Sequence, residues 1–152
     1  MTAARKPLAG VRVLDFSTLL PGPMATLILA EAGADVIKVE RPGSGEEMRH
    51  YPPKVTADSG VNFALLNRGK RSLAIDLKND ESIRLVRRLI TEVDVLVEQF
   101  RPGVMDRLGL GWEALKAINP ALVYCSITGW GQDGPKAQVA AHDLNYMAET
   151  GS

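Results

Sequence analysis

Basic side chains follow several short apolar runs of the sequence. Arg41, Lys78 and Arg101 each come one to a few positions after such a run, with Phe100 beside Arg101 and Arg107 shortly behind it. A guanidinium group binds phosphate through paired hydrogen bonds and also stacks on a flat ring such as adenine. These residue types therefore favour a ligand that carries both phosphates and a planar base.

The apolar runs that precede these residues predict the strands of a sheet. Runs rich in β-branched residues alternate with segments typical of helices or loops, which indicates βαβ units. The runs are mostly continuous, as in parallel sheets that helices cover on both faces. The pattern predicts an α/β fold with a doubly wound, mainly parallel sheet built from Val11–Phe16, Asp35–Val39, Ser72–Ile75, Val93–Val97 and Leu122–Ile127.

In an open parallel sheet, ligands bind beyond the carboxyl ends of the strands. The basic residues are therefore expected at one edge. After the first run, the segment 17–23 leads into a helix predicted from Met24, whose backbone N–H groups could face an anion. Asp80 is expected to cap the helix that follows the third run, and Pro102 to begin another helix.

A nicotinamide dinucleotide is one ligand with phosphates and a base. Glu40, at the end of the second run, stands where an acidic residue bonds the ribose in folds that bind it. Pro21, Gly22 and Pro23 replace the usual glycine-rich fingerprint, however, and proline has no N–H to offer a pyrophosphate. The sequence therefore disfavours a nicotinamide cofactor.

The composition of the chain limits the class of protein and its partners. The chain has 152 residues, 45% hydrophobic and 24% charged, as expected of one globular domain. Its 18 basic and 18 acidic residues cancel, so neither nucleic acid nor a membrane surface is an expected partner. The single cysteine, Cys125, is expected to be buried, and with no Cys/His cluster we expect no metal and a cytoplasmic location. No signal peptide or membrane span is predicted.

Seven motifs in one order resemble the class III CoA-transferase superfamily, which includes formyl-CoA and carnitine CoA-transferases and α-methylacyl-CoA racemase. The resemblance implies a Rossmann-like large domain that binds coenzyme A, a smaller domain in the full-length enzyme, and an interlocked homodimer. It rests on Gly10–Phe16, Pro21–Pro23, Gly33–Gly43, Leu66–Leu77, Val97–Gly103, Ile118–Tyr124 and Gly129–Pro135.

By this likeness, acyl-CoA is the substrate, and no cofactor is bound covalently. The family often has Asn where this chain has Gln99. The residues implied to contact coenzyme A are Leu20, Pro21, Arg41, Ile75, Asp76, Leu77, Lys78, Gln99, Phe100, Arg101 and Arg107.

The segment Ala141–Tyr146 resembles the racemase branch, with His142 at the position of its catalytic histidine. Inverting a carbon next to a thioester needs a base on one face and an acid on the other, and histidine can serve as either near neutral pH. Two alternatives stay open. One is a CoA-transferase with an aspartate nucleophile, and the other is a non-catalytic module that binds coenzyme A or another adenine nucleotide.

The resemblance also implies how much of the enzyme this sequence represents. Residues 1–152 are expected to form the amino-terminal part of the large domain, with the small domain and a later catalytic aspartate beyond Ser152. We therefore expect this chain alone to be inactive as an enzyme.

Overall fold

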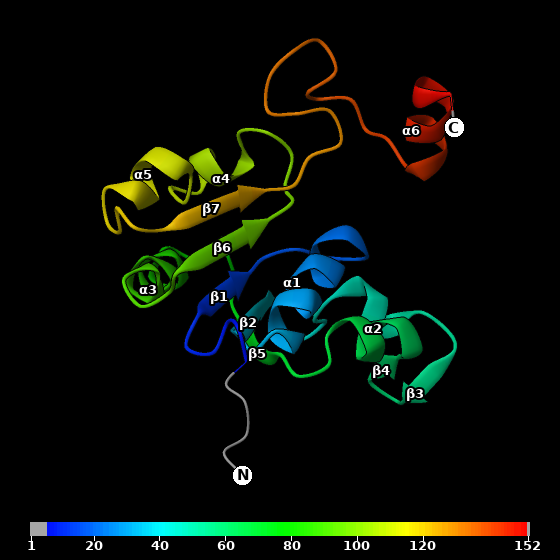
Figure 1. Cartoon of the computed structure of the whole chain (residues 1–152), viewed down its shortest axis with the longest axis horizontal. Coiled ribbons are helices and arrows are strands. Elements are labelled where there is room, and N and C mark those ends of the chain that lie inside the picture. Colours follow the sequence, from blue (N-terminus) through cyan, green and yellow to red (C-terminus); the bar gives the residue numbers. More distant parts are fainter. Residues whose placement is uncertain (1–5, 152) are drawn as a thin grey trace.

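The computed structural model describes residues 6–151, so positions 1–5 and 152 of the predicted domain lie outside the described residues. Its centre is a five-stranded sheet in which every neighbouring pair is parallel (Figure 1). The strand order is β5-β2-β1-β6-β7. The strands are β1 (Arg12–Asp15), β2 (Asp35–Glu40), β5 (Arg71–Ala74), β6 (Val95–Glu98) and β7 (Val123–Ser126).

This order confirms the doubly wound α/β fold. The chain builds outward from β1 through β2 to β5, and then returns to place β6 on the other side of β1. The reversal between β1 and β6 is the point where such sheets bind ligands, because the loops after these two strands diverge there.

Helices and a small hairpin complete the fold. The helices are α1 (Pro21–Glu31), the 3-10 helix η1 (Glu47–His50), α2 (Val61–Leu66), α3 (Asp80–Ile90), α4 (Val104–Arg107), α5 (Trp112–Lys116) and α6 (Asp143–Thr150). The antiparallel hairpin consists of β3 (Lys54–Thr56) and β4 (Ser59–Gly60). Within residues 6–151, no helix is long and apolar enough to cross a membrane.

Each face of the sheet has its own apolar core. On one face, Leu14 and Leu96 pack with Val86 and Ile90 of α3 and with Leu115 of α5. The other core contains Val13, Val36 and Val97, packed with Leu29 and Ala30 of α1. Adjacent strand residues point to opposite faces, so β1 contributes to both cores, as continuous apolar runs predict.

Several predicted element ends are wrong by a few residues. Helix α1 begins at Pro21 instead of Met24, because proline lacks only an N–H that has no partner in a first helical turn. Asn79, not Asp80, caps α3 and accepts the N–H groups of Glu81 (2.8 Å) and Ser82 (3.3 Å). Pro102 does not begin α4, because Gly103 intervenes with a left-handed φ of 81°.

Cys125 is exposed, so its predicted burial is wrong. Strand β7 lies at the edge of the sheet. Tyr124 packs against a core there, whereas Val123, which shares the opposite face with Cys125, is 59% exposed. An apolar run thus marks the strand correctly without showing which of its faces is covered.

The core face of α3 should carry most of that helix's stabilising energy. Ile90 is fully buried, so Ile90→Ala should lower the free energy of unfolding by about 2 to 5 kcal/mol through lost burial and the cavity left behind. Leu85 in the same helix is 40% exposed, and Leu85→Ala should cost about 1 kcal/mol or less. Urea unfolding of both variants measures the difference, and equal losses would contradict this assignment of the core.

Candidate functional site

The sheet gathers the residues implied to bind coenzyme A along one edge. Leu20 and Pro21 follow β1, Arg41 follows β2, the segment 75–78 follows β5, and the segment 99–101 follows β6. Because the four strands are parallel neighbours, these segments share the carboxyl edge of the sheet. Four stretches far apart in the sequence thus converge, as the strand pattern predicts.

Four cationic side chains at or near this edge are free to meet an anion. Arg41, Lys78, Arg101 and Arg107 are all exposed, and none forms an ion pair within the described part of the chain. Arg107 ends α4, and its Nη1 lies 3.4 Å from where a Cβ on Gly103 would stand, which places it over the turn that follows Arg101. Unpaired guanidinium and ammonium groups of this kind suit phosphate.

The side chains of other residues implied to bind coenzyme A pack in the core or bond to the backbone. Ile75 is buried, and Leu77 and Phe100 pack against the core around Leu14. The Asp76 carboxylate accepts the backbone N–H of Lys78 at 3.0 Å and so shapes its own turn. The side chains of Ile75 and Asp76 are therefore committed within the protein.

Gln99 joins the two loops that diverge between β1 and β6. Its Oε1 accepts the backbone N–H of Gly22 at 3.2 Å, and its Nε2 donates to Thr18 Oγ1 at 3.4 Å. A Cβ on Gly22 would lie 2.1 Å from Ser17 Cβ and 2.6 Å from Gln99 Oε1, so only glycine fits there. The glutamine thereby fixes the start of α1 against the end of β6.

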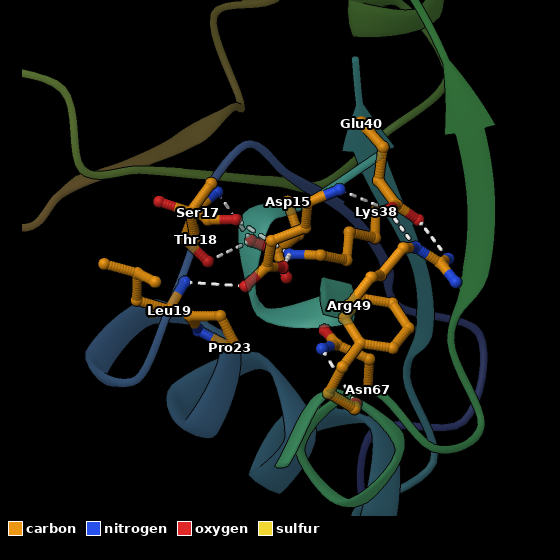
Figure 2. A network of polar contacts seen from close by, with 12 residues as sticks. Asp15, Ser17, Thr18, Leu19, Pro23, Lys38, Glu40, Arg49 and Asn67 are labelled. Carbon is orange, nitrogen blue, oxygen red and sulfur yellow. Dashed lines mark hydrogen bonds and ion pairs between the residues drawn. The ribbon is translucent and has the colours of Figure 1, made fainter. Parts of the chain in front are cut away.

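A network of buried and partly buried ionic side chains surrounds the ends of β1 and β2 (Figure 2). Asp15, at the end of β1, is fully buried, and its Oδ2 accepts from Thr26 Oγ1 at 2.5 Å and faces Lys70 Nζ at 3.2 Å. Lys70 Nζ also donates to the carbonyl of Pro23 (2.9 Å) and to Asn67 Oδ1 (2.9 Å). Burial lowers the pKa of Lys70, while the charge of Asp15 opposes that shift.

A second buried pair joins Lys38 of β2 to Glu46, with Nζ 2.6 Å from Oε2. Their side chains are 2% and 1% exposed. Both also bind the loop after β1, because Lys38 Nζ donates to the Ser17 carbonyl at 2.8 Å and Glu46 Oε1 accepts the Leu19 N–H at 2.7 Å. The pair thus connects β2 to the loop that enters α1.

Glu40 and Arg49 form the third pair. Arg49 donates from Nε to Oε2 at 2.6 Å and from Nη2 to Oε1 at 2.7 Å, and its guanidinium lies 3.8 Å over the ring of Phe63. Burial alone would raise the pKa of Glu40, but hydrogen bonds from Arg49, Ser72 and the Glu46 N–H outweigh it and lower that pKa to about 2. With these partners, Glu40 is not placed to bond a ribose.

The sequence analysis missed these pairs because their members are distant in the sequence. One signal was present: Lys38 and Glu40 alternate within an apolar strand and so share a face, where a charge must find a partner to be buried. Their partners, Glu46 and Arg49, both come from the segment after β2, which the strand pattern does not place.

Two hollows flank the edge. One, of about 210 Å³ at the ends of β6 and β7, is lined by Glu98, Arg101, Trp112 and Tyr124 among others. Burial raises the pKa of Glu98 despite hydrogen bonds from Ser126 and the Phe100 N–H. The other, of about 280 Å³, lies at the ends of β2 and β5 and includes Arg41.

Within residues 6–151, no group of His, Cys, Asp or Glu is arranged to hold a metal ion.

His142 is exposed at the N-cap of α6, where its backbone N–H donates to Asn145 Oδ1 at 2.8 Å. Helix α6 has no buried residue and lies apart from the sheet at the end of a long loop (Figure 1). It contacts that loop through the Tyr146 and Trp130 rings, 4.9 Å apart, and through an ion pair of Glu149 with Lys136 at 2.6 Å. The structure thus gathers the basic residues at the sheet and leaves His142 on a separate element.

Comparison with known proteins gives consistent matches over nearly the whole chain. The model of CoA-transferase family III matches residues 8–152. The succinyl-CoA:glutarate CoA-transferase of Mus musculus is 43% identical over 96% of this chain and 34% of that protein. The succinate–glutarate CoA-transferase of Agrobacterium fabrum is 45% identical over 99% of this chain and 39% of its own length.

A racemase, ranked below these CoA-transferases, and a solved structure also match. The alpha-methylacyl-CoA racemase of Mus musculus is 44% identical over 95% of this chain and 34% of that protein. The crystal structure of a CAIB/BAIF family protein from Brucella suis, 43% identical, superposes with a TM-score of 0.91 over 97% of this chain and 40% of its own. The chain spans about a third of the length of the curated relatives it matches.

Replacing Glu40 by Gln should change how stability depends on pH. The folded-state pKa of about 2 lies below the ordinary 4.5, so stability from the Glu40 charge is fully present above about pH 4.5 and is lost as pH falls toward 2. Unfolding titrations should show a smaller acid loss in Glu40→Gln than in the wild type. At neutral pH the free energy of unfolding of the variant should be about 2 to 3 kcal/mol lower than that of the wild type. The loss is not larger because Arg49 is 25% exposed and water can solvate its charge.

Glu31→Gln is the matched control, because Glu31 pairs with Arg68 where both side chains are more than half exposed. It should keep the wild-type loss of stability in acid. If Glu40→Gln also kept it in full, the Glu40–Arg49 pair would not be the source.

Proposed function

This chain belongs to CoA-transferase family III, and from that membership we propose that it binds a coenzyme A thioester along the carboxyl edge of its sheet. The four unpaired cationic side chains, Arg41, Lys78, Arg101 and Arg107, support this proposal. Coenzyme A carries phosphates, which these groups bind, and an adenine ring, on which arginine can stack. The other cations of this edge, Lys38, Arg49 and Lys70, are already paired with carboxylates and are not needed for the ligand.

For the reaction, we propose proton transfer at the carbon next to the thioester, as in an α-methylacyl-CoA racemase. The segment Ala141–Tyr146 supports it, because it resembles the racemase branch and His142 is exposed. A base removes the α-proton, the thioester oxygen takes up negative charge, and an acid returns a proton to the opposite face. His142 would act on one face.

The partner of His142 would come from polypeptide outside the matched region. Because the chain spans about a third of its relatives' length, we propose activity for a protein of their full size. In it, residues 1–152 form the amino-terminal part of the CoA-binding large domain, and this part alone supplies binding without turnover.

A second candidate is CoA transfer between carboxylic acids. The names of the Mus musculus and Agrobacterium fabrum relatives, at 43% and 45% identity, are those of CoA-transferases and favour it. A carboxylate nucleophile would then attack the thioester carbonyl, forming an anhydride as the C–S bond breaks and coenzyme A leaves as its thiolate, and the α-carbon would keep its proton. Both candidates use the same CoA-binding edge and differ in whether the α-proton exchanges.

Calorimetric titration with coenzyme A tests the binding edge. Arg41→Ala and Arg107→Ala should each weaken binding about tenfold, because each removes one charge-assisted contact to phosphate. The exposed helix residue Arg84 provides the control, and Arg84→Ala should bind like the wild type. The affinity for coenzyme A should fall as salt is added. Dephospho-CoA, which lacks one phosphate, should bind more weakly than coenzyme A. If both edge variants bound like Arg84→Ala, the phosphates would not lie at this edge.

Deuterium exchange separates the reactions. In a protein of the relatives' full length that carries this sequence, a 2-methylacyl-CoA should take up solvent deuterium at its α-carbon, and His142→Ala should reduce the rate by about a hundredfold or more. The same variant should keep its affinity for coenzyme A. CoA transfer to a carboxylic acid without exchange of the α-proton would favour the second candidate. Binding of coenzyme A with neither activity would favour a non-catalytic module.

A further inference from the structure

The loop between β1 and α1 contains an unusual backbone conformation. Leu19 has a φ of 60°, and within the described part of the chain it is the non-glycine residue with positive φ. Left-handed backbone is unfavourable for a side chain with a Cβ, and such a conformation persists only where its surroundings hold it. Leu19 immediately precedes Leu20 and Pro21, which are implied to contact coenzyme A.

The Lys38–Glu46 ion pair is what holds this conformation. Glu46 Oε1 accepts the N–H of Leu19 at 2.7 Å, and Lys38 Nζ donates to the carbonyl of Ser17 at 2.8 Å. The backbone is therefore held on both sides of Thr18 by two side chains that are themselves joined at 2.6 Å. Thr18 remains exposed between these contacts and accepts a hydrogen bond from Gln99.

Packing alone does not account for an ion pair at this place. Lys38 shares a face of β2 with the buried Val36, where an apolar side chain would fill space without the cost of burying a charge. Apolar side chains could not, however, accept the Leu19 N–H or donate to the Ser17 carbonyl. The charges therefore serve the loop backbone more than the core.

We propose that Lys38 and Glu46 are positioning residues for the CoA-binding edge. By holding the backbone of residues 17–19, they set where Leu20, Pro21 and the first turn of α1 stand relative to Gln99 and the neighbouring cations. This inference rests on the proposed function, since it assigns the pair to the same ligand site.

Two double variants that differ in one hydrogen-bond acceptor test the inference. Both Lys38→Met/Glu46→Gln and Lys38→Met/Glu46→Leu remove the two charges together, so neither leaves an unpaired buried charge. The first retains an amide oxygen that can accept the Leu19 N–H, and the second does not. Glu92→Gln, which breaks the exposed Arg12–Glu92 pair at the amino end of the sheet, is the control.

Calorimetry should find that Lys38→Met/Glu46→Leu binds coenzyme A about tenfold more weakly than Lys38→Met/Glu46→Gln. Urea unfolding should give similar midpoints for the two. Glu92→Gln should bind like the wild type. Equal affinity of the two double variants would overturn the proposal, as would a loss of affinity that only follows a loss of stability.

Amide hydrogen exchange on the unmodified chain tests the same inference without variants or ligand. The Leu19 amide should exchange as slowly as that of Leu14 in the central strand, and at least about tenfold more slowly than that of exposed Thr18. Fast exchange at Leu19 would overturn the positioning role. If coenzyme A did not bind while the Leu19 amide stayed protected, the proposed ligand would be wrong. The result would still support the contacts by which Lys38 and Glu46 hold the loop backbone.

Discussion

A charge can be buried only beside an opposite charge or a full set of hydrogen bonds, and this constraint organises the carboxyl edge of the sheet. Two buried cations and one partly buried cation stand there, and each has a carboxylate: Lys70 with Asp15, Lys38 with Glu46, and the partly buried Arg49 with Glu40. Because Asp15, Lys38 and Glu40 stand in the strands while their partners come from later segments, each pair ties a connecting segment to the sheet.

The same constraint divides the basic residues of the edge into two groups. Those paired with carboxylates have little charge left for a ligand, and they hold loops in place. Arg41, Lys78, Arg101 and Arg107 stay exposed and have no such partner in the described residues, so their charge is free for phosphate. A small anion-binding surface can therefore exist on a chain whose net charge is zero.

The fold and much of the carboxyl edge of the sheet could be predicted, because each parallel strand appears in the sequence as a local apolar run. Runs of β-branched residues located all five strands of the main sheet to within two residues of their ends, and the rule for parallel sheets then placed Arg41 and Arg101 on one edge. The hairpin β3–β4 and helix α2 were not predicted, because segments of two to six residues are too short to show a periodic pattern. Exposure of Cys125 and pairing of Glu40 depend on which distant segment covers a given face, and no local pattern contains that information.

The junction of Gly22, Ser17 and Gln99 has a consequence for how sequences of this kind can diverge. A Cβ at position 22 would collide with both of the other side chains, and Gln99 in turn reaches across to Thr18. A change at one of these positions thus alters what the others can accept, so their effects on fitness are not independent. Evolution at this loop would proceed through paired or ordered substitutions, and a shorter amide at position 99 would require a compensating shift at the start of α1.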